Sequence, residues 1–364
     1  MPLLQSKISL KIYSLKTLSK RLPLTHISSI VAVWILSSLF LQNFGSHKHL
    51  PLSYHLYHSA SAISLTGISN FKIGLNYNFI GEWILEILMI ISAIYILSRF
   101  SKDWKGILIY LGFGVLSGTL GLSIMFDQKL NGFQSLQELL HYSLFHSISA
   151  FTSCGLSLLQ NSMVEQNIYC ILILLFISLF GWLGYSNFYE IFAPEKVRER
   201  IKNGTGWNIL TKQALTYSAL ILLLGVLVNI IWLWNKNLLI IEKLTGSINL
   251  SVTAISGGFH WEGKHLFIML ILLAAIGGPK QGLSSGWKLL HWKDFRGYYF
   301  LLLPLVPLVL ISINSDATPQ TIFSCLLNNN SFEPQINKSA VLPILGIIMI
   351  YTKFCIVSVL SSER

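Results

Sequence analysis

The feature that most constrains the fold is a short polar segment, residues 145–158, between two long apolar runs at about 105–126 and 167–193. The segment is too short and too rich in serine and threonine to cross a bilayer, which takes about 20 apolar residues. Inside a membrane such a segment is tolerated only where protein or a water-filled cavity shields its backbone. The sequence therefore predicts a re-entrant half-helix here, and the alternative is a polar external loop.

The half-helix is expected to end in a glycine turn. Phe145, Ile148 and Phe151 keep helical spacing as far as the residue before Ser153. Gly155 follows, and glycine is the residue that takes a positive φ without steric cost. We therefore expect the chain to leave the helix between Ser153 and Gly155.

The composition indicates a polytopic membrane protein. Hydrophobic residues make up 53% of the 364 residues and charged residues 11%, with a mean hydropathy of +0.61. A soluble chain has about twice that share of charge. The length suits one helical bundle. Basic residues precede the first apolar run and no small-residue cleavage site follows it, so a cleavable signal is not expected. The four cysteines form no CxxC pair, so neither a disulfide framework nor a metal site is indicated.

The net charge of +11 predicts the orientation. Most of the 26 Lys and Arg residues lie in the N-terminal segment and in alternate loops at 99–105, 196–212 and 280–296. By the positive-inside rule these loops and both termini face the cytoplasm. The basic stretches are not interleaved with exposed aromatic residues, so no nucleic-acid partner is expected.

The order of span, short polar helix, turn and span recurs along the chain. Such self-similarity defines an architecture, and it predicts an all-α polytopic membrane protein. Its four tandem span–re-entrant loop–span repeats would surround a pseudo-fourfold central pore. The expected parts are a cytoplasmic N-terminal segment 1–26, pore repeats at 27–99, 105–193, 208–296 and 297–360, and a basic cytoplasmic linker at 194–207.

Four turns align at equivalent places in these repeats. Three have a glycine followed by a large apolar residue, and the fourth has Asn330, the next most tolerant residue of left-handed backbone. Around one axis, their backbone carbonyls would replace the hydration shell of a cation, and the negative ends of the half-helix dipoles would favour it. The alternative for each turn is a loop that closes on itself. The expected filter residues are Leu65, Thr66, Gly67, Ser153, Cys154, Gly155, Ser256, Gly257, Gly258, Asn328, Asn329 and Asn330.

The second span of the third repeat is interrupted at residues 277–286. Proline lacks an amide hydrogen and glycine disfavours helix, so we expect non-helical backbone that lines a cavity. We interpret this stretch as a gate below the filter, and the alternative is a kink needed for packing. Lys280 would raise an electrostatic barrier there or reach to the membrane surface. The expected gate residues are Gly277, Gly278, Pro279, Lys280, Gly282, Ser284, Ser285 and Gly286.

These motifs resemble those of the Trk/Ktr/HKT superfamily of potassium transport subunits. Residues 145–158 resemble the family's second filter region, Thr66–Ser69 the first and Ser251–Phe259 the third. Gly181–Tyr185 is similar to a glycine-rich stretch of the family's second-repeat inner helix. Gly277–Lys288 resembles the intramembrane loop that gates the family's pore.

The resemblance implies uptake of a monovalent cation, potassium before sodium, through a pore in the bacterial inner membrane. It implies no enzyme activity and no cofactor beyond the transported K⁺ or Na⁺. The implied partners are a second copy of the chain, in a homodimer, and a cytoplasmic ring of nucleotide-binding regulatory subunits. Whether transport is channel-like or ion-coupled stays open.

Four departures from the family pattern motivate a second hypothesis. Ile255 and Lys353 stand where the family usually has arginine, Asn330 replaces the fourth filter glycine, and Ser92–Tyr95 lacks the glycines of the first inner helix. The alternative is a degenerate, non-conducting membrane subunit with a structural or regulatory role. A membrane-embedded enzyme is the weakest hypothesis, because the chain has no HExxH, no GxSxG and no paired intramembrane aspartates.

Two residue pairs have the spacing of one helical turn. Glu82 and Glu86 lie near the outer end of a span, where carboxylates are functional suspects. Pairing with a loop lysine or with a donor on a pore helix is the alternative. His55 and His58 are spaced as zinc ligands are, but no acidic or cysteine partner follows them.

The charge pattern predicts the outcome of single-cysteine labelling in a cysteine-free background. Residues 194–207 should be labelled only from the cytoplasmic side, and residues 44–53 and 127–134 from the outside. Labelling of 194–207 in intact cells by an impermeant reagent would overturn this orientation.

Overall fold

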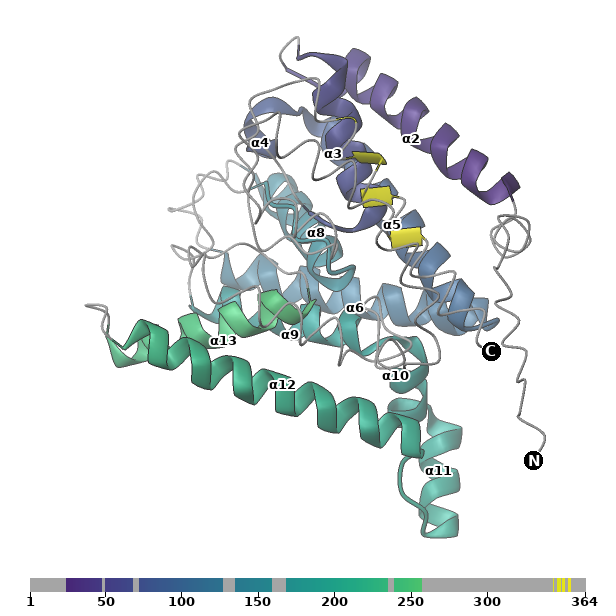
Figure 1. Cartoon of the computed structure of the whole chain (residues 1–364), viewed down its shortest axis with the longest axis vertical. Coiled ribbons are helices and arrows are strands. Elements are labelled where there is room, and N and C mark those ends of the chain that lie inside the picture. The colour runs from purple at the N-terminus through teal and green to yellow at the C-terminus, as the bar shows by residue number, and fades with distance from the viewer. Residues whose placement is uncertain are drawn as a thin grey trace, which may run out of the picture.

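The computed structural model describes residues 24–47, 50–67, 72–126, 135–158, 168–234 and 239–256, and single residues between 343 and 354. Within these ranges the fold is helical, and the one strand-like contact is an isolated antiparallel bridge between Ser46 and Tyr77. Figure 1 shows the helices packed as a bundle, with the basic helix α11 at its lower end.

The first group of helices has a short polar helix between two longer apolar helices. In space, α2 packs on α3 and α3 packs on α5 (Figure 1). Asn78 begins α5 by accepting a hydrogen bond from the amide of Gly81 at 3.0 Å, as a helix-capping residue does. The helices expected at 27–43 and 79–98 are confirmed. The group consists of α2 (Leu24–Phe44), α3 (Leu52–Ser64), α4 (Ile73–Asn76) and α5 (Phe79–Phe100).

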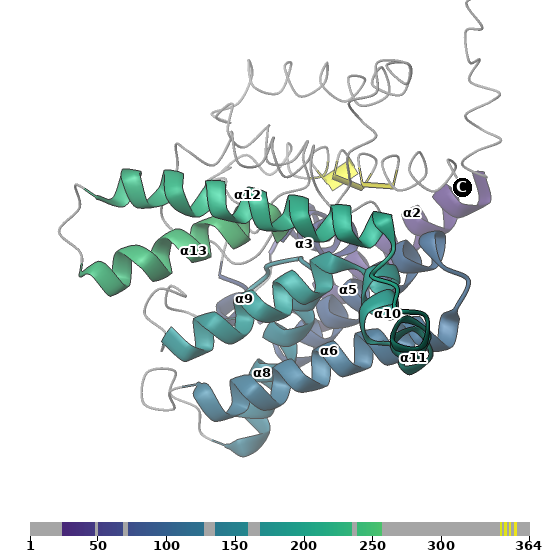
Figure 2. The ribbon, with the colours of Figure 1, turned by 90° about the horizontal axis from the view of Figure 1, so that it is seen from below.

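The second group repeats this order. Asp103 caps α6 by accepting from the amide of Gly106 at 3.0 Å. Ser135 accepts from the amide of Glu138 at 3.1 Å, so the sequence Ser-x-x-Glu starts α8 as in a capping box. The helix α8 packs against both α6 and α9 (Figure 2). The group consists of α6 (Trp104–Met125), α8 (Leu136–Phe151) and α9 (Ile168–Leu183).

The single span expected at 167–193 is instead two helices. α9 ends at Leu183, α10 (Tyr185–Phe192) follows, and their axes differ by 97°. Gly184 joins them with φ +80°, a conformation that costs glycine little and other residues more. The bend is therefore built on a glycine inside an apolar run, where hydropathy alone predicts one continuous span.

The basic linker is also helical. α11 (Pro194–Asn203) begins with proline at its first turn and ends at Gly204, whose φ is +60°. Arg200 donates to the carbonyl oxygens of Glu190 and Ile191, at 2.5 and 2.9 Å, and so caps the end of α10. The third group then follows as α12 (Ile209–Leu233) and α13 (Ile240–Ser256), which pack on each other, and α13 also packs on α9.

Two described helices, α5 and α6, are long and apolar enough to cross a membrane, and the bent pair α9–α10 would make a third. Large apolar side chains on α6 are exposed, among them Phe113, Leu116 and Ile124. Such a surface is costly in water and suits contact with lipid chains. The length and composition of these helices therefore indicate a membrane protein.

One hydrophobic cluster runs through the first two groups and reaches the last part of the chain. Ile350 and Phe354 belong to it. The rings of Tyr95 and Phe354 have centroids 5.3 Å apart and meet edge to face. The last described residues therefore pack against the first group of helices, although the two segments are far apart in the sequence.

The bend between α9 and α10, here called the elbow, lies at Gly184. It is linked to the start of α6 by a hydrogen bond from the hydroxyl of Tyr185 to Asp103. This bond, with the amide of Gly106, holds the pKa of Asp103 below its usual range. Because that pKa is lowered, the bond persists at neutral pH and is lost as acid protonates the carboxylate.

We predict that Tyr185→Phe loosens α10 and α11 and speeds tryptic cleavage between Lys196 and Lys202 at neutral pH. The matched control is Tyr169→Phe, which removes an exposed hydroxyl at the other end of α9. Equal cleavage rates in wild type and Tyr185→Phe would show that the bond does not hold the elbow.

Candidate ion filter

Two polar helices end in turns with the same backbone conformation. α3 ends at Ser64, and Leu65 and Gly67 follow with φ values of +54° and +63°. α8 ends at Phe151, and Ser153 and Gly155 follow with φ values of +58° and +83°. The positive φ predicted for Gly67 and Gly155 is confirmed. The positive φ of Leu65 and Ser153 was not predicted from the sequence.

The end of α3 shows why Leu65 takes this conformation. The amide of Leu65 donates to the carbonyl oxygen of Ala62 at 3.3 Å, and the amide of Thr66 donates to that of Ser61 at 3.0 Å. This pair of bonds is the Schellman motif, which satisfies the last carbonyls of a helix and needs a left-handed residue after it. Glycine usually fills that position, and here Leu65 does.

The end of α8 has the same motif at the same positions. The amide of Ser153 donates to the carbonyl oxygen of Ala150 at 3.0 Å, and that of Cys154 donates to Ser149 at 2.9 Å. Each partner lies at a constant sequence offset from its counterpart in α3. The two turns are therefore equivalent in hydrogen bonding as well as in backbone angles.

The equivalence extends into the helices. His58 donates through Nδ1 to the carbonyl oxygen of Tyr54 at 2.8 Å, and His146 does so to that of Tyr142 at 2.7 Å. All four residues keep the same offset. The imidazoles are buried, so each histidine fixes its own helix.

The two turns lie side by side. The Sγ atom of Cys154 is 4.0 Å from the carbonyl oxygen of Ser61, the same oxygen that accepts from Thr66. Thr66 in turn donates through Oγ1 to the Sδ atom of Met349 at 3.3 Å. The first turn thus lies near both the second turn and the last part of the chain.

Within each turn the glycine is the more accessible residue. The two residues before Gly67 and the two before Gly155 are buried, whereas both glycines are half-buried. The C-terminal ends of α3 and α8, which carry the negative ends of their dipoles, meet at these turns. Each turn therefore places a half-buried glycine beside the negative end of a helix dipole.

Glycines on neighbouring helices position the second turn. A Cβ atom on Gly181 would lie 1.8 Å from the carbonyl oxygen of Phe151, and one on Gly114 would lie 2.1 Å from the ring of Phe151. α6 and α9 can therefore approach the end of α8 only because both positions lack a side chain. Gly181 belongs to the glycine-rich stretch noted in the sequence, and this contact supplies its physical reason.

Other expected site residues are placed only in part. Ser256 is the last residue of α13, so the structure places it in the helix. Lys353 is buried and lies near enough to Cys154 to interact with it electrostatically. The remaining filter residues Gly257, Gly258, Asn328, Asn329 and Asn330, and the expected gate residues within 277–286, lie outside the described residues.

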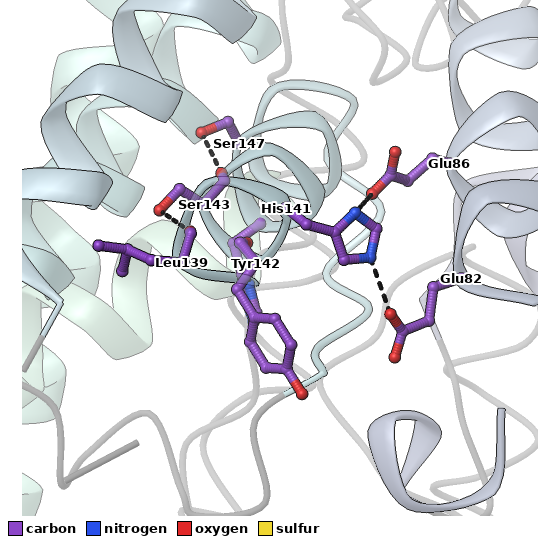
Figure 3. Close-up of polar contacts among 8 residues, drawn as sticks. Glu82, Glu86, Leu139, His141, Tyr142, Ser143 and Ser147 are labelled. Carbon is purple, nitrogen blue, oxygen red and sulfur yellow. Dashed lines mark hydrogen bonds and ion pairs between the residues drawn. The ribbon is translucent and has the colours of Figure 1, made fainter. Parts of the chain in front are cut away.

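The two one-turn pairs noted in the sequence have defined partners. Glu82 and Glu86 face His141 of α8, with oxygen-to-nitrogen distances of 2.8 and 3.6 Å (Figure 3). Pairing with a donor on the polar helix, one of the partners expected for these carboxylates, is therefore found. His55 is 3.1 Å through Nδ1 from the hydroxyl of Tyr77. In the part of the chain that the structure describes, no three His, Cys, Asp or Glu side chains are arranged to hold a metal ion.

Comparison with known proteins identifies relatives. Residues 106–254 match the family model described as TrkH, cation transport protein. The potassium/sodium uptake protein NtpJ of Enterococcus hirae is 25% identical over 182 residues, which is 47% of this chain and 38% of NtpJ. The chain thus matches well under half of the length of that relative.

A solved structure shares the fold. The crystal structure of the potassium transporter TrkH from Vibrio parahaemolyticus superimposes with a TM-score of 0.60 and 12% sequence identity. The match covers 86% of this chain and 79% of that one. At this identity the likeness concerns the helical fold alone.

Proposed function

We propose that this chain belongs to the Trk/Ktr superfamily and forms a pore for monovalent cations, because residues 106–254 match the TrkH family model and a potassium/sodium uptake protein is similar to part of the chain. Potassium is the favoured ion. The family is one of transporters, and we propose that the chain is no enzyme.

The observation that carries this proposal is the pair of equivalent turns at Leu65–Gly67 and Ser153–Gly155. Both follow a buried polar helix, both alternate left-handed and other backbone, and they lie next to each other. Backbone carbonyls in such turns can replace the water around a cation without any carboxylate. The ends of α3 and α8 add a favourable potential for positive charge.

The rest of the filter is proposed from the sequence. The turns at Ser256–Gly258 and Asn328–Asn330 would complete a ring of four, and the stretch 277–286 would form a flap that obstructs the pore below it. The hydrogen bond from Thr66 to Met349 supports the ring of four turns, since it brings the last expected repeat beside the first turn.

We propose that the chain is a multi-pass protein of the bacterial inner membrane with both termini in the cytoplasm. It would act as a homodimer and bind a cytoplasmic ring of nucleotide-binding regulatory subunits. The basic helix α11 offers a docking surface for such a ring, because it lies at the lower end of the bundle in Figure 1 and has no buried residue.

The test of transport is cation flux through purified protein in liposomes. Wild type should pass potassium, and Gly155→Ser should change the potassium-to-sodium ratio. A side chain at φ +83° costs about 1 kcal/mol or more, and the strain would move backbone carbonyls. The matched control is Gly112→Ser on α6, where an added Cβ meets no atom within 4 Å.

Two outcomes would contradict this proposal. Equal, small changes in selectivity from Gly155→Ser and Gly112→Ser would remove Gly155 from the filter. No flux from folded wild-type protein would instead favour the degenerate, non-conducting subunit that Asn330 suggests.

The docking surface on α11 gives a separate prediction. Replacing Lys196, Arg198 and Lys202 by glutamine should reduce recovery of a nucleotide-binding partner from mildly solubilised membranes. Arg200 is left in place, because it caps α10.

A control for this triple variant neutralises Lys72, Lys129 and Lys236, which the charge pattern places outside. If the α11 variant recovers the partner as well as this control does, the ring docks elsewhere.

A further inference from the structure

A buried carboxylate–imidazole cluster, Glu82, Glu86 and His141, joins the first group of helices to the second. The two glutamates lie one turn apart on α5, and the histidine projects from α8 between them (Figure 3). Their exposed fractions are 6%, 0% and 6%. The rings of Phe79 and Trp83 cover the imidazole, with centroids 4.6 and 5.4 Å away. Solvent therefore screens these charges little.

The hydrogen bonds of the cluster are incomplete. Nε2 of His141 lies 2.8 Å from Oε2 of Glu82, a normal hydrogen bond in which the imidazole donates. Nδ1 of His141 lies 3.6 Å from Oε1 of Glu86, which is too long for one. Both carboxylate oxygens of Glu86 and this Nδ1 are buried without a hydrogen-bond partner among the described residues. An ionised carboxylate that is buried without a hydrogen bond raises the free energy of the folded protein.

The charges of the cluster do not balance either. With both carboxylates ionised, even a protonated imidazole leaves one net negative charge, and in the described part of the chain the ion pairs of these carboxylates are with His141 alone. Of the neighbours on α8, Tyr142 lies near Glu82 and Glu138, and His146 lies near His141. The nitrogens of His146 are bonded to Tyr142 and Ser157. On the other described helices that pack against α5, the sequence places His26 in α2, Tyr54, His55, Tyr57 and His58 in α3, and Lys105 and Tyr110 in α6.

We propose that this cluster is a binding site for a proton, held between Oε1 of Glu86 and Nδ1 of His141. One proton there, carried by the carboxyl group of Glu86, satisfies Oε1 and Nδ1 at once as an O–H···N bond when the side chains close the 3.6 Å gap. With the imidazole neutral, it also lowers the net negative charge of the cluster from two to one. A hydronium ion supplies the proton and leaves as water, and release is the reverse step. Glu82 lies in the first turn of α5, so the expected topology makes the outer solution the source.

The bound proton stabilises the contact between α8 and α5. When it leaves, two buried carboxylates face one imidazole and repel each other, so the contact weakens as pH rises. The other end of α8 carries the turn Ser153–Gly155. The pH dependence of flux that follows from this link rests on the proposed function, whereas proton binding itself does not.

Infrared difference spectroscopy on purified wild-type protein during a pH titration tests the site without any transport. The carbonyl band of a protonated carboxylic acid should disappear on raising the pH. Glu86→Gln, which is nearly isosteric, should lack the band. Glu242→Gln, which removes an exposed glutamate at the start of α13, should keep it. A band that persists in Glu86→Gln, or that is absent from wild type, would overturn the proposal.

A second variant and a second readout cover the case in which Glu86→Gln fails to fold. His141→Gln removes the imidazole acceptor and should shift the frequency of the band, and an unshifted band would contradict the shared proton. In thermal unfolding, the midpoint of wild type and Glu242→Gln should fall as pH rises, and that of His141→Gln or Glu86→Gln should depend less on pH. An identical pH dependence in all variants would show that the cluster does not fasten α8.

Flux measurements separate this inference from the proposed function. Wild-type flux should vary with outer pH, and flux through Glu86→Gln should not. Flux that is absent while the infrared band behaves as expected would reject the pore and keep the proton site. Flux that varies equally in both proteins would reject the link between the site and the turn.

Discussion

The carbonyl groups at the end of a buried helix have no water to bind, and the rest of this structure depends on how two such ends are satisfied. α3 and α8 stop inside the bundle, and each closes its last carbonyls with the same two backbone hydrogen bonds. This closure forces Leu65 and Ser153 into left-handed backbone. The chain then turns sharply enough for a half-buried glycine to follow two residues later in each turn. Each turn therefore has a half-buried glycine directly after buried residues.

Neighbouring helices make room for this arrangement through missing side chains. Gly181 and Gly114 let α9 and α6 touch Phe151 at the end of α8. Past Gly181, the chain bends by 97° at Gly184, and the elbow is fastened to α6 by Tyr185. The end of α8, the bend at Gly184 and the start of α6 are therefore joined by close packing and a hydrogen bond.

Much of the helical layout could be predicted from the sequence, because apolar runs in a membrane protein are set by bilayer thickness. The polar segment ending at Phe151 and the positive φ of Gly155 followed from serine content and the placement of glycine. The left-handed backbone of Leu65 and Ser153 could not be predicted. It is imposed by the hydrogen bonds at the helix end, and neither residue type favours it. The bend at Gly184 is hidden by apolar neighbours. His141 could not be matched to Glu82 and Glu86, because contacts between distant segments carry no local pattern.

The central claim is that the turns Leu65–Gly67 and Ser153–Gly155 hold a permeating cation between them. The most direct measurement is anomalous scattering from crystals of the protein grown in rubidium, which replaces potassium and marks its position. The account predicts a rubidium peak beside these two turns, within coordination distance of their backbone oxygens. Well-diffracting crystals saturated with rubidium that show no peak there would contradict it.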